Sequence, residues 1–86
     1  MEVQIQNELG LHLRAAAAFA KLAEGYRSEV SMLRDDLRAN GKSIISLVTL
    51  AAPKGTRVVV VAEGDDAQEA VSALTDLIER KFGESA

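Results

Sequence analysis

The sequence predicts an α+β fold of two layers, in which helices cover one face of a sheet. Two runs of helix length, residues 13–24 and 67–82, repeat apolar residues with a helical period. Between and before them lie short segments in which apolar residues alternate with polar ones or are β-branched, as is typical of strands. The expected order is β-α-β-β-α-β-α, in one domain spanning residues 1–86.

The first strand is expected over residues 2–6, where apolar and polar residues alternate. Residues 7–11 form a loop. The helix over 13–24 is rich in alanine, the best helix former, and Gly25 is expected to end it. Its buried face is predicted to consist of Ala16, Phe19, Ala20, Ala23 and Tyr26.

A hairpin is expected next. Residues 28–33 alternate as a second strand, residues 34–36 make a polar turn, and residues 37–39 favour a short third strand. Because the turn is short, the two strands are expected to pair antiparallel.

The run 44–51 is ambiguous, since its β-branched residues favour a strand. Ser43 is a good N-cap, however, and Pro53 and Gly55 can close the segment. We therefore predict a short helix here. Such a helix has few polar residues and cannot bury every side, so part of its apolar surface is expected to be exposed.

The clearest strand is the valine-rich run 57–62, whose continuous apolar character indicates a central place in the sheet. A last helix is expected over 67–82, followed by a frayed tail at 83–86. Its start is predicted to carry a capping box, formed by Asp65 with Gln68 or by Asp66 with Glu69. Its buried stripe is predicted to be Ala67, Ala70, Val71, Leu74, Leu77 and Ile78.

Composition narrows the functional classes. The chain is 48% apolar and 27% charged, with a net charge of −3, as expected for a globular protein. It lacks a basic tract and has few aromatic residues, which argues against nucleic acid as a partner. Without cysteine, and with one histidine, a metal site is not expected. No signal peptide or membrane span is expected, and a cytoplasmic location fits the absence of cysteine.

The single histidine, His12, stands directly before the alanine-rich helix. A helix start offers unpaired N–H groups and the positive end of the dipole, and both bind anions such as phosphate. The dipole also favours neutral imidazole, whose lone pair can attack phosphorus. Gly10 can adopt a positive φ, and Arg14 can hold phosphate oxygens. His12 is thus a candidate phosphoryl acceptor; phosphate binding without transfer and a plain surface or packing role stay open.

Four motifs occur in a fixed order along the chain. They are Gly10-Leu11-His12-x-Arg14, Asn40-Gly41-Lys42-Ser43-Ile44, Gly55, and Ala62-Glu63-Gly64-Asp65-Asp66. In this order and spacing they resemble the histidine-containing phosphocarrier protein (HPr) family of the phosphoenolpyruvate-dependent phosphotransferase system. The resemblance covers nearly the whole chain.

The resemblance implies an open-faced β-sandwich, with a four-stranded antiparallel sheet of order 1-4-2-3 covered on one face by three helices. It also implies that His12 is phosphorylated on Nδ1 by the phosphorylated first enzyme of the system. The phosphoryl group then passes to a histidine on an acceptor domain of a sugar permease or a regulator. Such a protein is a stoichiometric carrier and not a turnover enzyme, needs no cofactor, and is expected to be a monomer. A regulatory phosphorelay of the nitrogen type and a small anion-binding sensor module are the alternatives.

The family also implies roles on a docking surface. Ser43 becomes a candidate for regulatory phosphorylation by a dedicated serine kinase, besides its role as N-cap. The short helix is expected to dock partners through Ile44, Ile45 and Val48. By its charge, Lys21 is a candidate for the rim of this surface, and a plain place on a solvated helix face stays open. Two residues depart from the family pattern, since Leu13 and Ala15 stand where alanine and proline are usual. Leu13 is bulkier beside the reactive ring, and Ala15 loosens the first helical turn.

Overall fold

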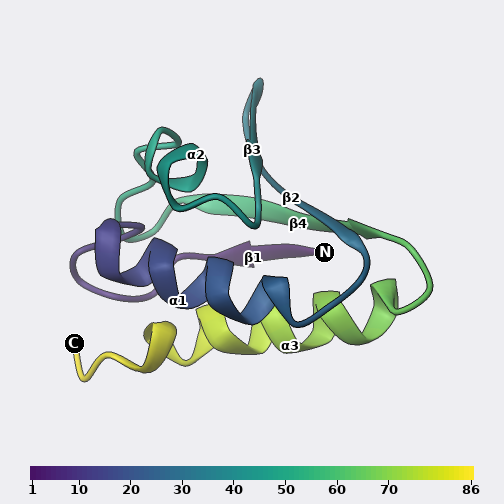
Figure 1. The fold of residues 1–86 in the computed structure, drawn as a ribbon. Helices are drawn as coiled ribbons and strands as arrows, with labels where there is room; N and C mark the ends of the chain where they lie inside the picture. Colours follow the sequence, from purple (N-terminus) through teal and green to yellow (C-terminus); the bar gives the residue numbers. More distant parts are fainter.

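The computed structural model describes residues 1–86, and its centre is a four-stranded antiparallel sheet. The strands lie in the order β1 (Glu2–Gln4), β4 (Arg57–Glu63), β2 (Glu29–Arg34) and β3 (Leu37–Asn40) (Figure 1). The valine-rich strand β4 pairs with β1 on one side and β2 on the other, so its predicted central place is confirmed.

Helices α1 (Leu13–Glu24) and α3 (Ala67–Glu79) run side by side along one face of the sheet (Figure 1). The short helix α2 (Ile44–Val48) packs against α1 and β3. A turn of 3₁₀ helix, η1 (Lys81–Gly83), follows α3. The predicted fold class and strand order are confirmed. None of these helices has both the length and the apolar character needed to cross a membrane.

The core lies between the sheet and the helices. In β4, Val58 and Val60 are fully buried whereas Val59 and Val61 are half-buried, because side chains alternate between the covered and the open face. The predicted buried face of α1 is confirmed for its three alanines and Phe19, which let the helix lie close to the sheet. Tyr26, predicted to belong to that face, is half-buried beyond the helix end. The stripe of α3 is buried at Ala70, Leu74, Leu77 and Ile78, and half-buried at Ala67 and Val71.

Helix α2 begins after Ser43 as predicted but ends at Val48, three residues before the predicted end at Ala51. Ala51 has φ +50°, a left-handed conformation that ends a helix. Arg34, at the end of β2, reaches across and donates from Nη1 to the carbonyls of Leu50, at 2.6 Å, and Ala51, at 2.7 Å. A tertiary contact thus satisfies these carbonyls, and the helix ends before it reaches Pro53 and Gly55.

The start of α3 does not carry the predicted capping box. Asp66 is the N-cap residue, but its side chain makes no bond to the helix. Its carboxylate instead accepts from the Oγ of Ser28 at 2.5 Å, the N–H of Ser28 at 3.0 Å and the N–H of Arg27 at 2.9 Å. These hydrogen bonds, that of Ser28 Oγ first, lower the pKa of Asp66 from its usual 3.8 to about 2. The carboxylate therefore ties the start of α3 to the start of β2.

The last helix ends at Glu79 and not at Phe82 as predicted. Lys81 and Phe82 both have left-handed backbones, with φ +60° and +56°, which turns the chain sharply. The turn puts the Phe82 side chain into the core, where it is 7% exposed. Burying a large aromatic side chain offsets the conformational cost of left-handed backbone. The turn also sends residues 83–86 back toward the loop before α1 (Figure 1).

Candidate functional site

His12 is the N-cap residue of α1, with an extended backbone at φ −83° and ψ −176°. Its Nδ1 accepts a long hydrogen bond of 3.3 Å from the backbone N–H of Arg14. The Nδ1 atom therefore faces the first turn of the helix, where N–H groups have no partners within the helix. About a quarter of the side chain, 26%, is exposed. The ring is thus partly open to solvent, and its Nδ1 lies at the end of the helix that favours an anion.

The other ring nitrogen is held by the end of the chain. Nε2 of His12 lies 2.5 Å from Oε2 of Glu84, a residue 72 positions away. A carboxylate only accepts hydrogen bonds, so Nε2 carries the hydrogen. Nδ1 accepts from an N–H, so it carries the lone pair. The two contacts agree on one tautomer, in which Nδ1 is the nucleophilic atom.

Asn7 fixes both the loop and Glu84. Its fully buried side chain donates from Nδ2 to the carbonyl of Gly10, at 2.7 Å, and to Oε1 of Glu84, at 2.9 Å. Oδ1 of Asn7 has no partner, but the reverse orientation of the amide would set this oxygen against two acceptors. The N–H of Glu8 also donates to the carbonyl of Ala86 at 2.9 Å. The prediction of a frayed tail is therefore wrong.

Glu84 is a carboxylate in this arrangement. Partial burial raises the pKa of its carboxyl group, but the hydrogen bonds that Asn7 and His12 donate, together with the positive charge of Arg14, outweigh this effect. The net result is a pKa below the usual range, so Glu84 carries a negative charge next to Nε2 at neutral pH.

The loop that carries His12 is fixed from the opposite side by a glycine. Gly10 has the predicted positive φ, +70°, and a Cβ atom there would lie 2.5 Å from the carbonyl oxygen of Ala52. That same oxygen accepts a 2.8 Å hydrogen bond from the N–H of Leu11. Only glycine permits this close approach, which sets the position of His12 relative to the segment after α2.

Arg14 lies in the first turn of α1 and is exposed. It borders the same surface hollow as Glu84, together with Leu9 and Phe82. The first turn of α1 contains no acidic residue. Arg14 and the helix start therefore form a positive environment beside the ring of His12, where phosphate oxygens would gather.

The residues expected to dock partners lie together. Ser43 caps α2 as predicted, accepting from the N–H of Ser46 at 3.2 Å. Lys21 of α1 borders one surface hollow with Ser43, Ile44 and Ile45. Ile45 is 80% exposed, and Ile44 and Val48 are each 37% exposed, whereas Leu47 faces the core. The predicted exposure of apolar residues on α2 is therefore confirmed.

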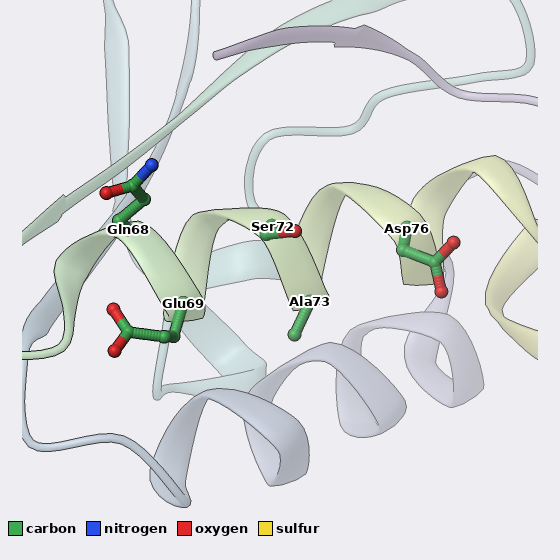
Figure 2. A pocket seen from close by; sticks show the side chains of 5 residues that line it. All are labelled: Gln68, Glu69, Ser72, Ala73 and Asp76. Carbon is green, nitrogen blue, oxygen red and sulfur yellow. The ribbon is translucent and has the colours of Figure 1, made fainter.

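A third hollow lies on α3 and has a different character. Figure 2 shows its five side chains along that single helix, namely Gln68, Glu69, Ser72, Ala73 and Asp76. Two carboxylates stand among them, and none of the residues predicted to function is there. An anion would be repelled from this hollow, so the site before α1 is the stronger candidate for phosphate chemistry.

Reasoning from sequence alone missed Asn7 and Glu84 as members of the site. Asn7 lies three residues before the first motif, in the predicted loop, where a buried amide leaves no periodic signal. Glu84 lies in a short polar tail, and its partner is 72 residues away. No local pattern predicts that contact, because it depends on the turn at Lys81 and Phe82.

Comparison with known proteins assigns the fold to a class. Residues 1–80 match the family described as PTS HPr component phosphorylation site. The crystal structure of HPr-C-His from Thermoanaerobacter tengcongensis superposes with a TM-score of 0.94 at 42% sequence identity, covering 100% of this chain and 97% of that one.

Proteins related in sequence point to the same family. The phosphocarrier protein HPr of Neisseria meningitidis serogroup A is 49% identical over 82 residues, covering 95% of this chain and 92% of that protein. The phosphocarrier protein NPr of Shewanella violacea is 33% identical over 85 residues, covering 99% and 93%. The chain therefore belongs to the HPr family of phosphocarrier proteins of the phosphotransferase system.

Proposed function

We propose that this protein is a cytoplasmic phosphoryl carrier that is loaded on His12 by the phosphorylated first enzyme of the phosphotransferase system. It passes the group to a histidine on an acceptor domain of a sugar permease or a regulator, and acts stoichiometrically. The observation that carries the proposal is the placement of Nδ1, which bears the lone pair and faces the open start of α1. Membership of the HPr family supports the same role.

The transfer requires little of the carrier beyond position and charge. A bond forms between Nδ1 of His12 and phosphorus while the nitrogen–phosphorus bond of the donor breaks, and the donor nitrogen takes the electron pair. The Arg14 N–H, which bonds to Nδ1 before the reaction, becomes free to donate to a phosphoryl oxygen. The guanidinium of Arg14 can hold a second oxygen. Because the transition state is loose, such electrostatic support is the main contribution a carrier makes.

The docking surface consists of Lys21, Ser43, Ile44, Ile45 and Val48. Exposed isoleucines next to a charged site are typical of a protein interface, since their burial on docking drives association. Lys21 supplies a rim charge that speeds encounter with acidic partners. A phosphate on Ser43 would sit among groups that must lose water on docking, so it would weaken the complex.

The direct test of the carrier role is incubation with phosphoenolpyruvate and a purified first enzyme, followed by intact mass spectrometry at alkaline pH. We expect one acid-labile phosphate on the wild-type protein and none on His12→Ala. Thermal melting of both proteins shows whether the variant still folds. An equal phosphate signal on His12→Ala would refute the assignment. Tight binding of a metabolite by a wild-type protein that takes up no phosphate would favour the sensor alternative.

The docking surface is tested with Ile45→Glu, which adds a charge at the most exposed apolar residue of α2. Leu37→Glu is the matched control, because Leu37 is a 52% exposed apolar residue at the start of β3. In a titration against the first enzyme we expect Ile45→Glu and Ser43→Asp to raise KM several-fold with little change in kcat, and Leu37→Glu to do neither. Equal effects of both glutamates would place the interface elsewhere.

A further inference from the structure

The carboxylate of Glu84 lies beside the imidazole ring of His12, the ring that reacts in the proposed function. It contacts Nε2, the nitrogen that does not react, and lies in the tail beyond residues 1–80, which match the family. We propose that Glu84 is a positioning residue that holds His12 in its reactive tautomer and stabilises the positive charge the ring acquires on phosphorylation. This proposal rests on the proposed function, since it describes how the same histidine is loaded.

The charge follows from the bonds of the reaction. As Nδ1 donates its electron pair to phosphorus, the ring keeps the hydrogen on Nε2 and becomes a phosphoimidazolium. The Nε2–H group is then a stronger donor, and its partner is a carboxylate 2.5 Å away. Hydrogen bonds between two charged groups are roughly twice as strong as neutral ones. Glu84 therefore stabilises the phosphorylated ring of His12 more than the unphosphorylated ring.

The same carboxylate also repels the phosphoryl group, and the two effects must be compared. The phosphoryl group forms on Nδ1, on the other side of the ring from Nε2, where the backbone N–H of Arg14 at the helix start faces it. The attraction acts at hydrogen-bonding distance and the repulsion across the width of the ring. The Coulomb energy falls with distance, which favours the attraction, and the N–H groups of the helix start offset the larger negative charge of the phosphoryl group.

The tail is held firmly enough for this role. Oε1 of Glu84 accepts from the fully buried Asn7, and the carbonyl of Ala86 accepts from the N–H of Glu8. Phe82 anchors the turn that precedes the tail in the core. The side chain of Glu84 is only 17% exposed, so water screens its contact with His12 incompletely.

Two variants separate the charge from the hydrogen bond. Glu84→Gln keeps one oxygen that can accept from Nε2–H, replaces the oxygen that accepts from Asn7 with an NH₂ group, and removes the charge. Glu84→Ala removes the charge and both acceptors. Glu8→Gln is the matched control, because Glu8 is a neighbouring carboxylate that pairs with Lys54 at 2.8 Å and does not touch His12. Thermal melting of all variants reports any loss of folding.

The first measurement is the equilibrium distribution of phosphate between the first enzyme and the carrier, followed by ³¹P NMR. We expect Glu84→Gln to lower the equilibrium constant for loading by roughly five- to tenfold, without slowing onward transfer to an acceptor domain. Glu8→Gln should behave as wild type. A wild-type equilibrium constant for Glu84→Gln would overturn the proposal.

The second measurement needs no phosphate. ¹⁵N NMR of the imidazole should show a hydrogen on Nε2 and none on Nδ1 in the wild type and in Glu84→Gln, and a mixture of tautomers in Glu84→Ala. A wild-type ring with its hydrogen on Nδ1 would overturn the proposal even if loading proceeds. If the wild type is not loaded at all, the proposed function itself fails, and the stabilising role of Glu84 fails with it.

Discussion

Two helices of this protein begin in similar surroundings and differ in what they can bind. Both α1 and α3 follow a glycine with positive φ, Gly10 at +70° and Gly64 at +148°. Each glycine presses against a distant backbone, Gly10 on Ala52 and Gly64 on Ser28, where a Cβ atom would lie within 2.9 Å of a backbone atom. Both starts are thus pinned to another part of the fold.

The charges around the two starts are opposite. The first turn of α1 has no acidic residue and carries Arg14, whereas that of α3 contains Glu69 and follows Asp65 and Asp66. The positive end of the helix dipole is therefore open to a phosphate at α1 and already surrounded by carboxylates at α3. The comparison teaches that the start of α1 suits the phosphate chemistry we propose, because its own first turn carries no carboxylate and His12 supplies a nucleophile.

The largest effect, on the rate of phosphoryl transfer, should come from removing the positive charge of Arg14 at the start of α1. Arg14→Ala should slow phosphoryl transfer roughly 10- to 100-fold while the helix persists, because alanine favours a first turn and, in the proposed function, the guanidinium supports the transferring group. Arg14→Lys should recover part of the rate, since lysine lacks the planar fork. Rapid-quench kinetics in both directions measures the change.

Arg27→Ala is the control for Arg14→Ala, because Arg27 is an exposed arginine near the start of α3, 3.6 Å from Asp65. We expect its transfer rate to be unchanged. Equal transfer rates for Arg14→Ala and wild type would assign Arg14 to the solvated surface. The charge of Arg14 would then no longer distinguish the start of α1 from that of α3.

The next largest effect is expected from replacing Gly10 or Gly64, and it concerns the stability of the fold. Gly10→Ala and Gly64→Ala should each lower the free energy of unfolding by about 2 kcal/mol or more, through left-handed strain and a clash with backbone. Only Gly10→Ala should also reduce transfer at temperatures where both variants are folded, because only that loop positions His12. Urea unfolding and transfer assays at low temperature separate the two losses, and a matching loss of transfer in Gly64→Ala would contradict the distinction.

The smallest effect, on thermal stability, should come from the carboxylate of Asp66 at the start of α3. Because the pKa of Asp66 falls to about 2 on folding from a usual 3.8, its ionised form stabilises the protein. That contribution is fully present above pH 3.8 and is lost as the pH falls toward 2. Asp66→Asn should therefore lower Tm by several degrees at neutral pH, with a difference from wild type that shrinks as the pH approaches 2. Asp65→Asn, in an exposed neighbour, should show no such pattern; a constant difference for Asp66→Asn would refute the linkage.

The elements of this fold follow from local sequence. Alanine content and helical period predict α1 with the bounds that the structure has, and the valine run predicts the central strand β4. Ser43 predicts the start of α2 because N-capping involves a backbone N–H only three residues away. His12, Arg14 and Gly10 could be singled out for the same reason, since the chemistry of a helix start depends on adjacent residues.

Contacts between distant residues were decided by the tertiary structure. The sequence predicts that Asp66 caps α3, but its carboxylate instead accepts three hydrogen bonds from Ser28 and Arg27, which lie 38 and 39 residues away. The tail was predicted to fray, but burial of Phe82 turns it so that Glu84 meets His12. Periodicity and capping rules describe neighbours along the chain, whereas these partners become neighbours only once the core has formed. The sequence by itself therefore determined which histidine stands at a helix start, and the folded core decided which carboxylate holds its other nitrogen.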